Sequence, residues 1–362
     1  MRTIQMSSYT VGEDCFEAIP AVLAPYQAKT VVLVGGRRAL AAAAPGIRAA
    51  LDSANVQILD EIVYGTDSTQ SAIDALVANR AFRDADIAFA IGGGKAVDTV
   101  KTAAKELDKT VFSVPTICSN CSSATAIAVV YNDDHSLKGY AYPDAPAHIF
   151  INPAIIAAAP EEYFWAGIGD ALSKQPEVEY ATSEAELTHT GTLGLTLAHT
   201  CTDPLMAYGE QGLADVRVGQ SSEAVRQIAL DIVVNTGYVS NLTNQPDFYY
   251  NSSLAHAFYN ATTGVQRPGR THLHGEVVSF GVLVLFAYTS DTEQLARYAA
   301  FNKKLGLPVT LAELDLDESH LQRIAELAQN TNEWKQANPA PFSPEGFIEA
   351  IKAADAFGRN LK

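Results

Sequence analysis

Short β-branched runs alternate with longer helical patterns over the first 115 residues, and this alternation restricts the fold more than any other feature. It is typical of parallel strands joined by crossover helices. The pattern predicts strands over residues 30–34, 56–59, 86–91 and 110–114, and helices over 39–54, 68–79 and 96–107. We therefore expect a Rossmann-like, doubly wound parallel sheet, with Ser68 as a candidate cap of its helix.

Helical periodicity replaces the strand signals from about residue 160, with long patterns over 181–198, 221–234 and 311–330. At 362 residues the chain exceeds the usual size of one core. We expect an α/β domain over residues 1–159 and an all-helical domain over 160–362. A hairpin around the turn at 132–135 is predicted within the first domain.

The charge balance and the apolar runs exclude two classes of partner. A net charge of −16 disfavours nucleic acid, which needs clustered Lys and Arg. The longest apolar run, Val277 to Tyr288, is too short to span a bilayer and predicts a buried helix. Because the N-terminus shows no signal core, we expect a cytoplasmic protein acting on a small molecule.

Cysteines are too few for a disulfide scaffold, since the chain has only 4. Cys118 and Cys121 form a single C-x-x-C pair, and one such pair cannot make a tetrahedral zinc site. We expect the pair to line a loop.

A glycine loop, Gly92-Gly93-Gly94-Lys95, lies between a predicted strand and a predicted helix. Missing side chains let a backbone approach a pyrophosphate, and the helix N-terminus adds partial positive charge. An ordinary tight turn is the alternative, because the loop is neither G-x-G-x-x-G nor a Walker loop. Asp98, one helical turn on, and Thr116, after the next strand, favour the dinucleotide interpretation.

These pieces, taken with others downstream, resemble the glycerol dehydrogenases and their iron-type alcohol dehydrogenase relatives. The matching segments are Gly92 to Asp98, Pro115 to Ser119, Tyr131, Gly167 to Ser173, Ala255 to Ala257 and His274 to Val278. The resemblance covers nearly the whole chain. It implies the dehydroquinate synthase-like fold of that superfamily, with a dinucleotide-binding domain, a helical domain and a catalytic metal in the cleft between them. Homo-oligomers are common in that family.

The resemblance also implies cofactor contacts in the first domain. Those expected near the pyrophosphate are Gly93, Gly94, Lys95 and Asp98, and those expected on the adenosine and nicotinamide halves are Thr116, Ser119, Thr125, Ile127 and Tyr131.

One departure from the family concerns the choice of cofactor. Relatives that use NAD typically carry an Asp after the first strand, where it repels a 2′-phosphate, whereas this chain has Gly36 followed by Arg37 and Arg38. Guanidinium groups suit phosphate, so we expect NADP(H) in preference to NAD(H). The alternative is that the two arginines only begin a solvated helix.

Asp170, His256 and His274 coincide with metal-ligand positions of the resembled family. Hydride transfer at a carbinol carbon needs a Lewis acid for the charge on oxygen, and this donor set suits Zn²⁺, with Fe²⁺ or Ni²⁺ possible. Taken alone, Asp170 could cap a helix, and a lone His more often has a structural role. His272 is the rival ligand, or a substrate contact in the preceding loop.

Two further departures bear on the substrate. Glycerol dehydrogenases carry an Asp after the Pro-Thr strand end, where this chain has Cys121, and iron-type enzymes carry a ligand His where it has Lys174. Both changes make the site more positive, which favours a carboxylate-bearing substrate. We therefore predict reduction of a 2-oxo acid to a 2-hydroxy acid, as a hydroxycarboxylate dehydrogenase branch of the superfamily would do.

Three alternatives remain open from the sequence. The first is oxidation of glycerol or another vicinal diol with NAD, using Ser119, Asn120 and Ser122 as polar contacts. The second is cyclisation, as in 3-dehydroquinate synthase, although no cluster of extra basic residues is present. The third is a non-catalytic, nucleotide-binding redox sensor, with Cys118 and Cys121 as its thiols.

Overall fold

The chain forms two compact units in a computed structural model that describes residues 3–134, 136–265 and 272–361. Residues 1–161 and 214–241 make the first unit, and residues 162–213 and 242–362 make the second. The sequence predicted a single boundary at residue 160 and did not predict that residues 214–241 return to the first unit. His135, at the end of the predicted turn, lies outside the described residues.

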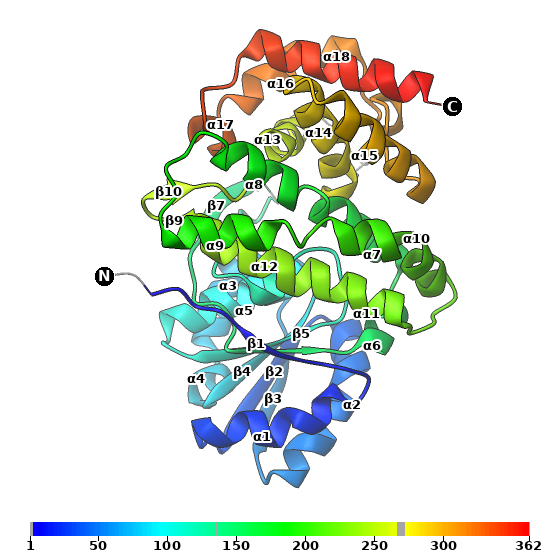
Figure 1. Ribbon diagram of the computed structural model, residues 1–362. Coiled ribbons are helices and arrows are strands. Elements are labelled where there is room, and N and C mark those ends of the chain that lie inside the picture. Colours follow the sequence, from blue (N-terminus) through cyan, green and yellow to red (C-terminus); the bar gives the residue numbers. More distant parts are fainter. Residues whose placement is uncertain (1–2, 135, 266–271, 362) are drawn as a thin grey trace. The chain divides into compact units, whose positions relative to one another are not determined.

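A six-stranded parallel sheet forms the centre of the first unit, in the order β1-β8-β5-β4-β2-β3 (Figure 1). Its strands are β1 (Ser8–Val11), β2 (Thr30–Gly35), β3 (Gln57–Val63), β4 (Ile87–Gly92), β5 (Thr110–Pro115) and β8 (His148–Ile151). The sequence predicted β2 to β5. It missed β8, which is buried, and β1, which pairs with β8 from Ser8 opposite His148 and lies half-exposed at the sheet edge.

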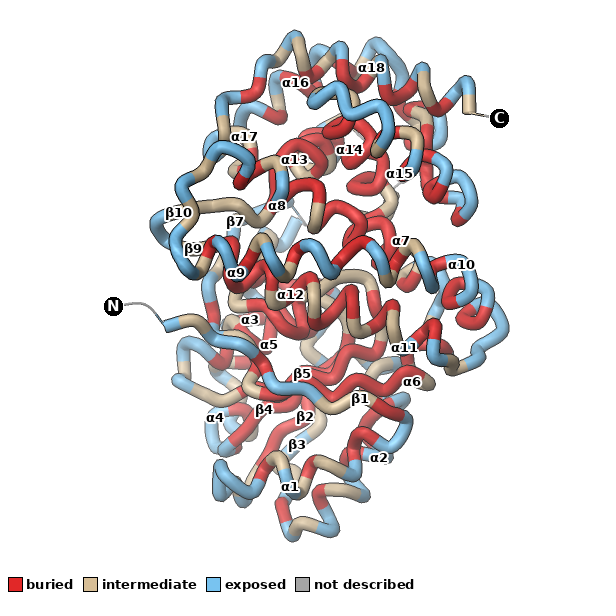
Figure 2. Tube along the Cα trace, viewed as in Figure 1, coloured by how far each residue is buried: buried red, intermediate tan, exposed pale blue. Residues whose placement is uncertain are grey.

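Helices cover both faces of this sheet, which explains why its central strands read as continuous apolar runs. Val31 and Leu33 face the core beneath α1 (Ile19–Leu23) and α2 (Arg37–Ser53). Val32 and Val34 face the core beneath α3 (Gln70–Ala78), α4 (Arg80–Asp84) and α5 (Gly94–Glu106). These strand residues are fully buried, and Figure 2 shows the central strands β2 and β4 mainly in red. The doubly wound prediction is therefore confirmed.

The remaining elements of the first unit are η1 (Cys15–Ala18), α1 (Ile19–Leu23), η2 (Ala24–Tyr26), α2 (Arg37–Ser53), α3 (Gln70–Ala78), α4 (Arg80–Asp84), α5 (Gly94–Glu106), η3 (Ser122–Ala124), β6 (Ala128–Tyr131), β7 (Leu137–Ala141) and α6 (Pro153–Ala157). Among them, α2, α3 and α5 match the three predicted helices with small shifts, whereas α1, α4 and α6 were not predicted. The antiparallel pair of β6 and β7 confirms the hairpin. Thr69, rather than Ser68, caps α3, because its side chain accepts from the Ala72 amide.

Helices dominate the rest of the chain. They are α7 (Glu161–Ala171), α8 (Lys174–Thr182), α9 (His189–Ala198), α10 (Asp203–Arg217), α11 (Glu223–Leu230), the π-helix η4 (Asp231–Asn235), α12 (Thr236–Thr243), α13 (Leu254–Thr262), α14 (His274–Tyr288), α15 (Thr292–Leu305), η5 (Ala312–Leu314), η6 (Glu318–His320), α16 (Leu321–Ala328), α17 (Asn332–Lys335) and α18 (Pro344–Asn360). Of these, α11, η4, most of α12 and the last residues of α10 belong to the first unit.

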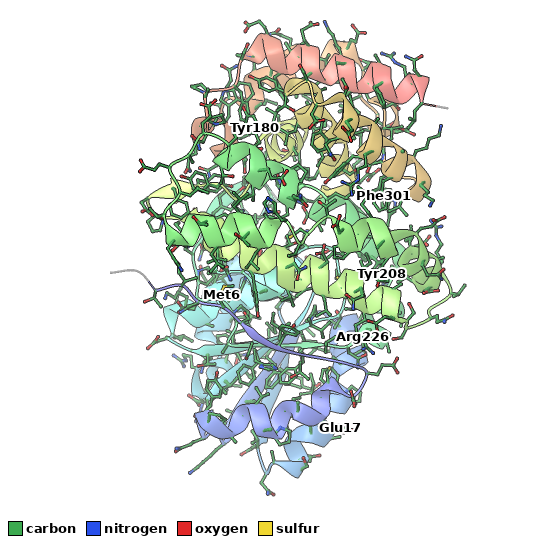
Figure 3. The ribbon with its side chains drawn as sticks, viewed as in Figure 1. Met6, Glu17, Tyr180, Tyr208, Arg226 and Phe301 are labelled. Atoms are coloured by element: carbon green, nitrogen blue, oxygen red, sulfur yellow. The ribbon has the colours of Figure 1, made fainter. Side chains whose placement is uncertain are left out.

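The second unit packs around α14, which is buried along nearly its whole length, as predicted for the apolar run. Phe301 on α15 fits against Gly209 of α10, where an added Cβ would lie 2.9 Å from its ring (Figure 3). The all-helical prediction was wrong in one detail, the two-stranded pair β9 (Asn244–Gln245) and β10 (Phe248–Tyr249). Among the described helices, none is both long and apolar enough to cross a membrane.

Candidate active site

The glycine loop connects β4 to α5 without room for side chains. Gly92 has a φ of +150°, which other residues rarely adopt. A Cβ at Gly93 would clash with Ile117, and one at Gly94 would lie 2.7 Å from Asn120 Nδ2. Because no side chain caps α5, its first amides are available to an anion, as pyrophosphate binding requires.

Lys95 and Asp98, expected near the pyrophosphate, and Thr116, expected on another part of the dinucleotide, take different positions. Lys95 is exposed, with its Nζ 3.0 Å from Asp67 and 5.9 Å from the centre of the Tyr131 ring. Thr116 is buried, and its amide donates to the Gly92 carbonyl over 3.3 Å. Asp98 is also buried, and it accepts hydrogen bonds from Ser122 and from the Val129 amide.

Gly36 caps the N-terminus of α2, at the carboxyl end of β2. An added Cβ at Gly36 would meet no atom within 4 Å, so the surrounding space is open. Arg37 and Arg38 are exposed, and neither pairs with another residue in the described ranges. The position that would hold an acid in NAD-dependent relatives is therefore open and flanked by cations.

The loop after β5 carries Ser119, Cys121, Thr125 and Ile127. Ser119, Cys121 and Ile127 are partly exposed, whereas Thr125 is buried and its hydroxyl bonds within the loop. Cys118 is buried as well. Burial, reinforced by the charge of Asp231, raises the pKa of the Cys118 thiol far above its usual value, which disfavours the redox-sensor alternative.

Asp170, His256 and His274 come together in the second unit. Asp170 lies at the end of α7, His256 on α13, and His274 is the first residue of α14. The Asp170 carboxylate oxygen lies 2.9 Å from His274 Nε2 and 3.6 Å from His256 Nε2, and one ligand atom from each residue fits within 4.8 Å. Asp170 is not a helix N-cap, so that alternative was wrong.

Two close contacts between helix backbones produce this cluster. A Cβ at Gly275 would clash with the Ala166 carbonyl and lie 2.7 Å from the Asp170 amide, so α14 touches α7. Gly281 brings α14 equally near α13, where an added Cβ would lie 2.6 Å from the Ala255 carbonyl. The glycines therefore bring the three helices to within ligand distance.

Glu177 on α8 orients one of the two histidines, and the sequence analysis did not single it out. Its carboxylate is fully buried and accepts from His256 Nδ1 over 2.6 Å and from the Ser253 amide over 2.7 Å. This holds the proton on Nδ1 and leaves Nε2, the atom facing Asp170, as a ligand. No sequence signal marks Glu177, because it differs from the neighbouring Glu179 in being buried, and burial is seen only in the structure.

Charge interactions within the cluster outweigh burial. Burial disfavours the charged forms, but His274 and His256 keep the pKa of Asp170 well below its usual value. Burial alone would lower the pKa of His256, whereas Glu177 and Asp170 raise it to about 10. The pocket is therefore strongly favourable to positive charge, whether a proton or a metal ion carries it.

His272 and Lys174 lie outside the triad. His272 is in the segment before α14, with Nδ1 2.8 Å from Glu276 and Nε2 3.3 Å from Asp315. Lys174 is buried, and its Nζ donates to the backbone oxygen of Asn251 over 2.9 Å and to its side-chain oxygen over 2.7 Å. Neither is a member of the metal-ligand group formed by described residues.

Known proteins are similar to this chain in sequence. A family profile described as iron-containing alcohol dehydrogenase matches residues 10–160. A glycerol dehydrogenase from Thermotoga maritima is 31% identical over 83% of this chain and 82% of its own length. The chain belongs to the glycerol dehydrogenase-like, iron-containing alcohol dehydrogenases. A hydroxycarboxylate dehydrogenase A from Escherichia coli is 29% identical over 91% of each chain.

Solved structures of this family agree in fold. A probable glycerol dehydrogenase from Sinorhizobium meliloti matches with a TM-score of 0.85 and 26% identity over the full length of both chains. The glycerol dehydrogenase of Schizosaccharomyces pombe matches with a TM-score of 0.87 over 100% of this chain and 92% of its own, at 24% identity. Membership of this oxidoreductase family implies a nicotinamide cofactor and a divalent metal.

Proposed function

We propose that this alcohol dehydrogenase interconverts a small 2-oxo acid and the corresponding 2-hydroxy acid with NADP(H). The observation that carries the cofactor preference is the open position at Gly36, flanked by the unpaired Arg37 and Arg38. The relatives support the substrate class only in part, because they include both a hydroxycarboxylate dehydrogenase and glycerol dehydrogenases.

Asp170, His256 and His274 would hold the divalent metal. Two ligand atoms on one tetrahedral metal lie about 3.4 Å apart when each bond is about 2.1 Å. The separations from the Asp170 oxygen, 2.9 and 3.6 Å, fit that value. One carboxylate with two imidazoles suits Zn²⁺ best, with Fe²⁺ or Ni²⁺ as alternatives.

The bound metal would supply Lewis acidity, stabilising negative charge on the substrate oxygen during hydride transfer. Glu177 keeps the Nδ1 proton of His256 in place so that Nε2 remains a ligand. Tyr259 packs edge-on against the His274 ring, with ring centres 4.2 Å apart, and restricts the orientation of that ring.

The first unit would bind the dinucleotide. The uncapped N-terminus of α5 would receive the pyrophosphate, and Arg37 and Arg38 would face the 2′-phosphate of NADP(H). Without a carboxylate at position 36, no negative charge there would repel that phosphate.

Two residues support an anionic substrate. Cys121 provides no carboxylate in the loop where glycerol dehydrogenases carry an Asp, and a thiol is a poor acceptor for polyol hydroxyls. Lys174 places a buried ammonium in the second unit, directly after the family segment that ends at Ser173. Both differences favour a carboxylate over a neutral polyol.

The test compares cofactors and substrates directly. The zinc-supplemented protein is incubated with NADPH or NADH and 2-oxobutyrate, and with NAD and glycerol in the reverse direction. We expect faster NADPH consumption with the oxo acid. In Gly36→Asp the NADPH preference should fall by about 10-fold or more through charge repulsion, whereas the uncharged Gly36→Asn should retain it.

A second candidate is NAD-linked oxidation of glycerol or another vicinal diol. The 31% identity to the Thermotoga maritima glycerol dehydrogenase favours it. Robust glycerol oxidation with NAD, together with no response to Gly36→Asp, would establish this candidate and overturn the first.

A further inference from the structure

Lys101, on α5, buries its ammonium group completely inside the first unit. Its Nζ donates to the backbone carbonyls of Ser122, Thr125 and Ile127 over 2.8, 3.0 and 2.7 Å. Asp98 lies one turn earlier on the same helix, with a carboxylate oxygen 3.1 Å from Nζ. The ammonium therefore lies in a cage of oxygen atoms that the loop after β5 largely provides.

These partners require the charged form of the lysine. Backbone carbonyls and a carboxylate can only accept, and a neutral amine has one N–H fewer than an ammonium to offer them. Burial lowers the pKa of Lys101 below its ordinary value, and the Asp98 carboxylate offsets only part of that effect. A buried cation without partners would be costly, so the carbonyls of the loop are held pointing inward.

Other side chains hold the carbonyls between those that Lys101 binds. Ser113 Oγ donates to the Ser123 carbonyl over 2.7 Å. Asn241 Nδ2 donates to the Ala124 carbonyl over 2.8 Å, and Asn241 Oδ1 accepts from the Ala126 amide over 2.8 Å. Side chains from outside the loop therefore bond to the backbone of every residue from 122 to 127.

We propose that Lys101 is a positioning residue for the dinucleotide, acting through the loop of residues 116–127. The inference rests on the proposed dinucleotide site, because that loop carries Ser119, Cys121 and Ile127, which are partly exposed. Fixing the carbonyls inward leaves these side chains in one arrangement before the cofactor binds. A loop ordered in advance loses less conformational entropy on binding, which strengthens affinity.

The experiment replaces the charge at matched positions on one helix. Lys101→Met keeps the length of the side chain and removes the ammonium, whereas Lys105→Met removes an exposed ammonium that pairs with Asp144 over 2.9 Å. The readouts are the NADPH dissociation constant by fluorescence titration, amide hydrogen exchange over residues 117–127, the KM for NADPH, kcat and the bound metal.

We expect Lys101→Met to weaken NADPH binding about 10-fold or more and to raise the KM for NADPH more than it lowers kcat. Exchange within the loop should accelerate, while the metal content stays that of the parent, because the metal ligands lie in the second unit. Lys105→Met should match the parent in every readout.

Ser113→Ala keeps the test decisive if Lys101→Met does not fold. It removes one hydrogen bond to the loop without leaving a buried charge. It should weaken NADPH binding about threefold and accelerate exchange within the loop. Unchanged NADPH affinity in a folded Lys101→Met, or in Ser113→Ala, would overturn the proposal, with or without faster exchange. If the parent binds neither NADPH nor NADH, the proposed function fails instead, and loop exchange still reports on Lys101.

Discussion

In the first unit, side chains fix the backbone of a loop, whereas in the second unit close contacts between helix backbones position the candidate ligand side chains. Lys101, Ser113 and Asn241 bond the carbonyls of the loop after β5. In the second unit, Gly275 and Gly281 let three helices touch, and the helices present Asp170, His256 and His274. A loop lacks the regular backbone hydrogen bonds of a helix or sheet and needs such partners. A helix already pairs its own backbone groups and can supply a rigid base for ligands.

The buried histidines of the two units show the same contrast in charge. His148, in the sheet, lies between the hydroxyls of Ser8 and Thr10, and burial lowers its pKa to about 4. In the second unit, His256 lies between Glu177 and Asp170, which raise its pKa to about 10 against the effect of burial. Hydroxyls accommodate a neutral ring, while carboxylates favour positive charge.

Removing a carboxylate from the cluster should have the largest effect. In Asp170→Asn the metal loses its charged ligand, and we expect activity to fall about 1000-fold or more. Metal content measured by plasma mass spectrometry should fall with it. Asp203→Asn, at an exposed site on α10, should keep both metal and activity. An active Asp170→Asn enzyme would show that the cluster in the second unit does not hold a catalytic metal.

Gly275→Ala tests whether backbone contact builds the cluster. Helix propensity alone predicts a gain of about 1 kcal/mol from this change. Because the added Cβ would clash with the Ala166 carbonyl, we instead expect the free energy of unfolding to fall by about 3 kcal/mol, with loss of metal. Denaturant titration measures the sign. Gly36→Ala, where the space is open, should leave stability near that of the parent.

Glu177→Gln tests the orientation of His256 without changing side-chain size. Two backbone amides, of Ser253 and His256, hold one oxygen of residue 177, so the amide nitrogen of Gln should face His256 Nδ1. This would move the proton of the neutral ring to Nε2, the ligand atom. We expect metal affinity to fall about 10-fold to 100-fold in a chelator competition. Parent-like affinity would show that Glu177 does not set the tautomer.

The smallest predicted effect concerns the pH dependence of the first unit. The folded-state pKa of His148 lies below its ordinary value, so the unfolded chain binds the proton first as the pH falls. Stability is therefore lost on acidification through the ordinary pKa of about 6.5, by about 1 kcal/mol between about pH 7 and about pH 5.5. His148→Gln should lose that much less over the same interval in urea titrations. Equal slopes would show that His148 does not titrate on unfolding.

The central strands were predictable because local patterns encode them, whereas the candidate ligands were predicted from the resemblance to a known family. β2, β4 and β5 are buried on both faces and read as apolar runs. β3 lies half-exposed at one edge of the sheet, and β1 alternates polar and apolar residues at the other. The predicted helical run over 181–198 is divided between α8 and α9. Periodicity alone could not locate that division, because the non-helical residues 183–188 include good helix formers such as Glu184, Ala185 and Leu187.

The sequence by itself determined a doubly wound sheet, a helical second half and the glycine loop, and its resemblance to a known family indicated the candidate metal ligands. Tertiary structure alone decided that Glu177 and Lys101 are buried beside His256 and the loop carbonyls. The physical reason is that strand and helix patterns depend on neighbours along the chain. The effect of a buried charge instead depends on partners that folding brings from distant parts of the chain, as with Glu177 and His256 or Asn241 and Ala124.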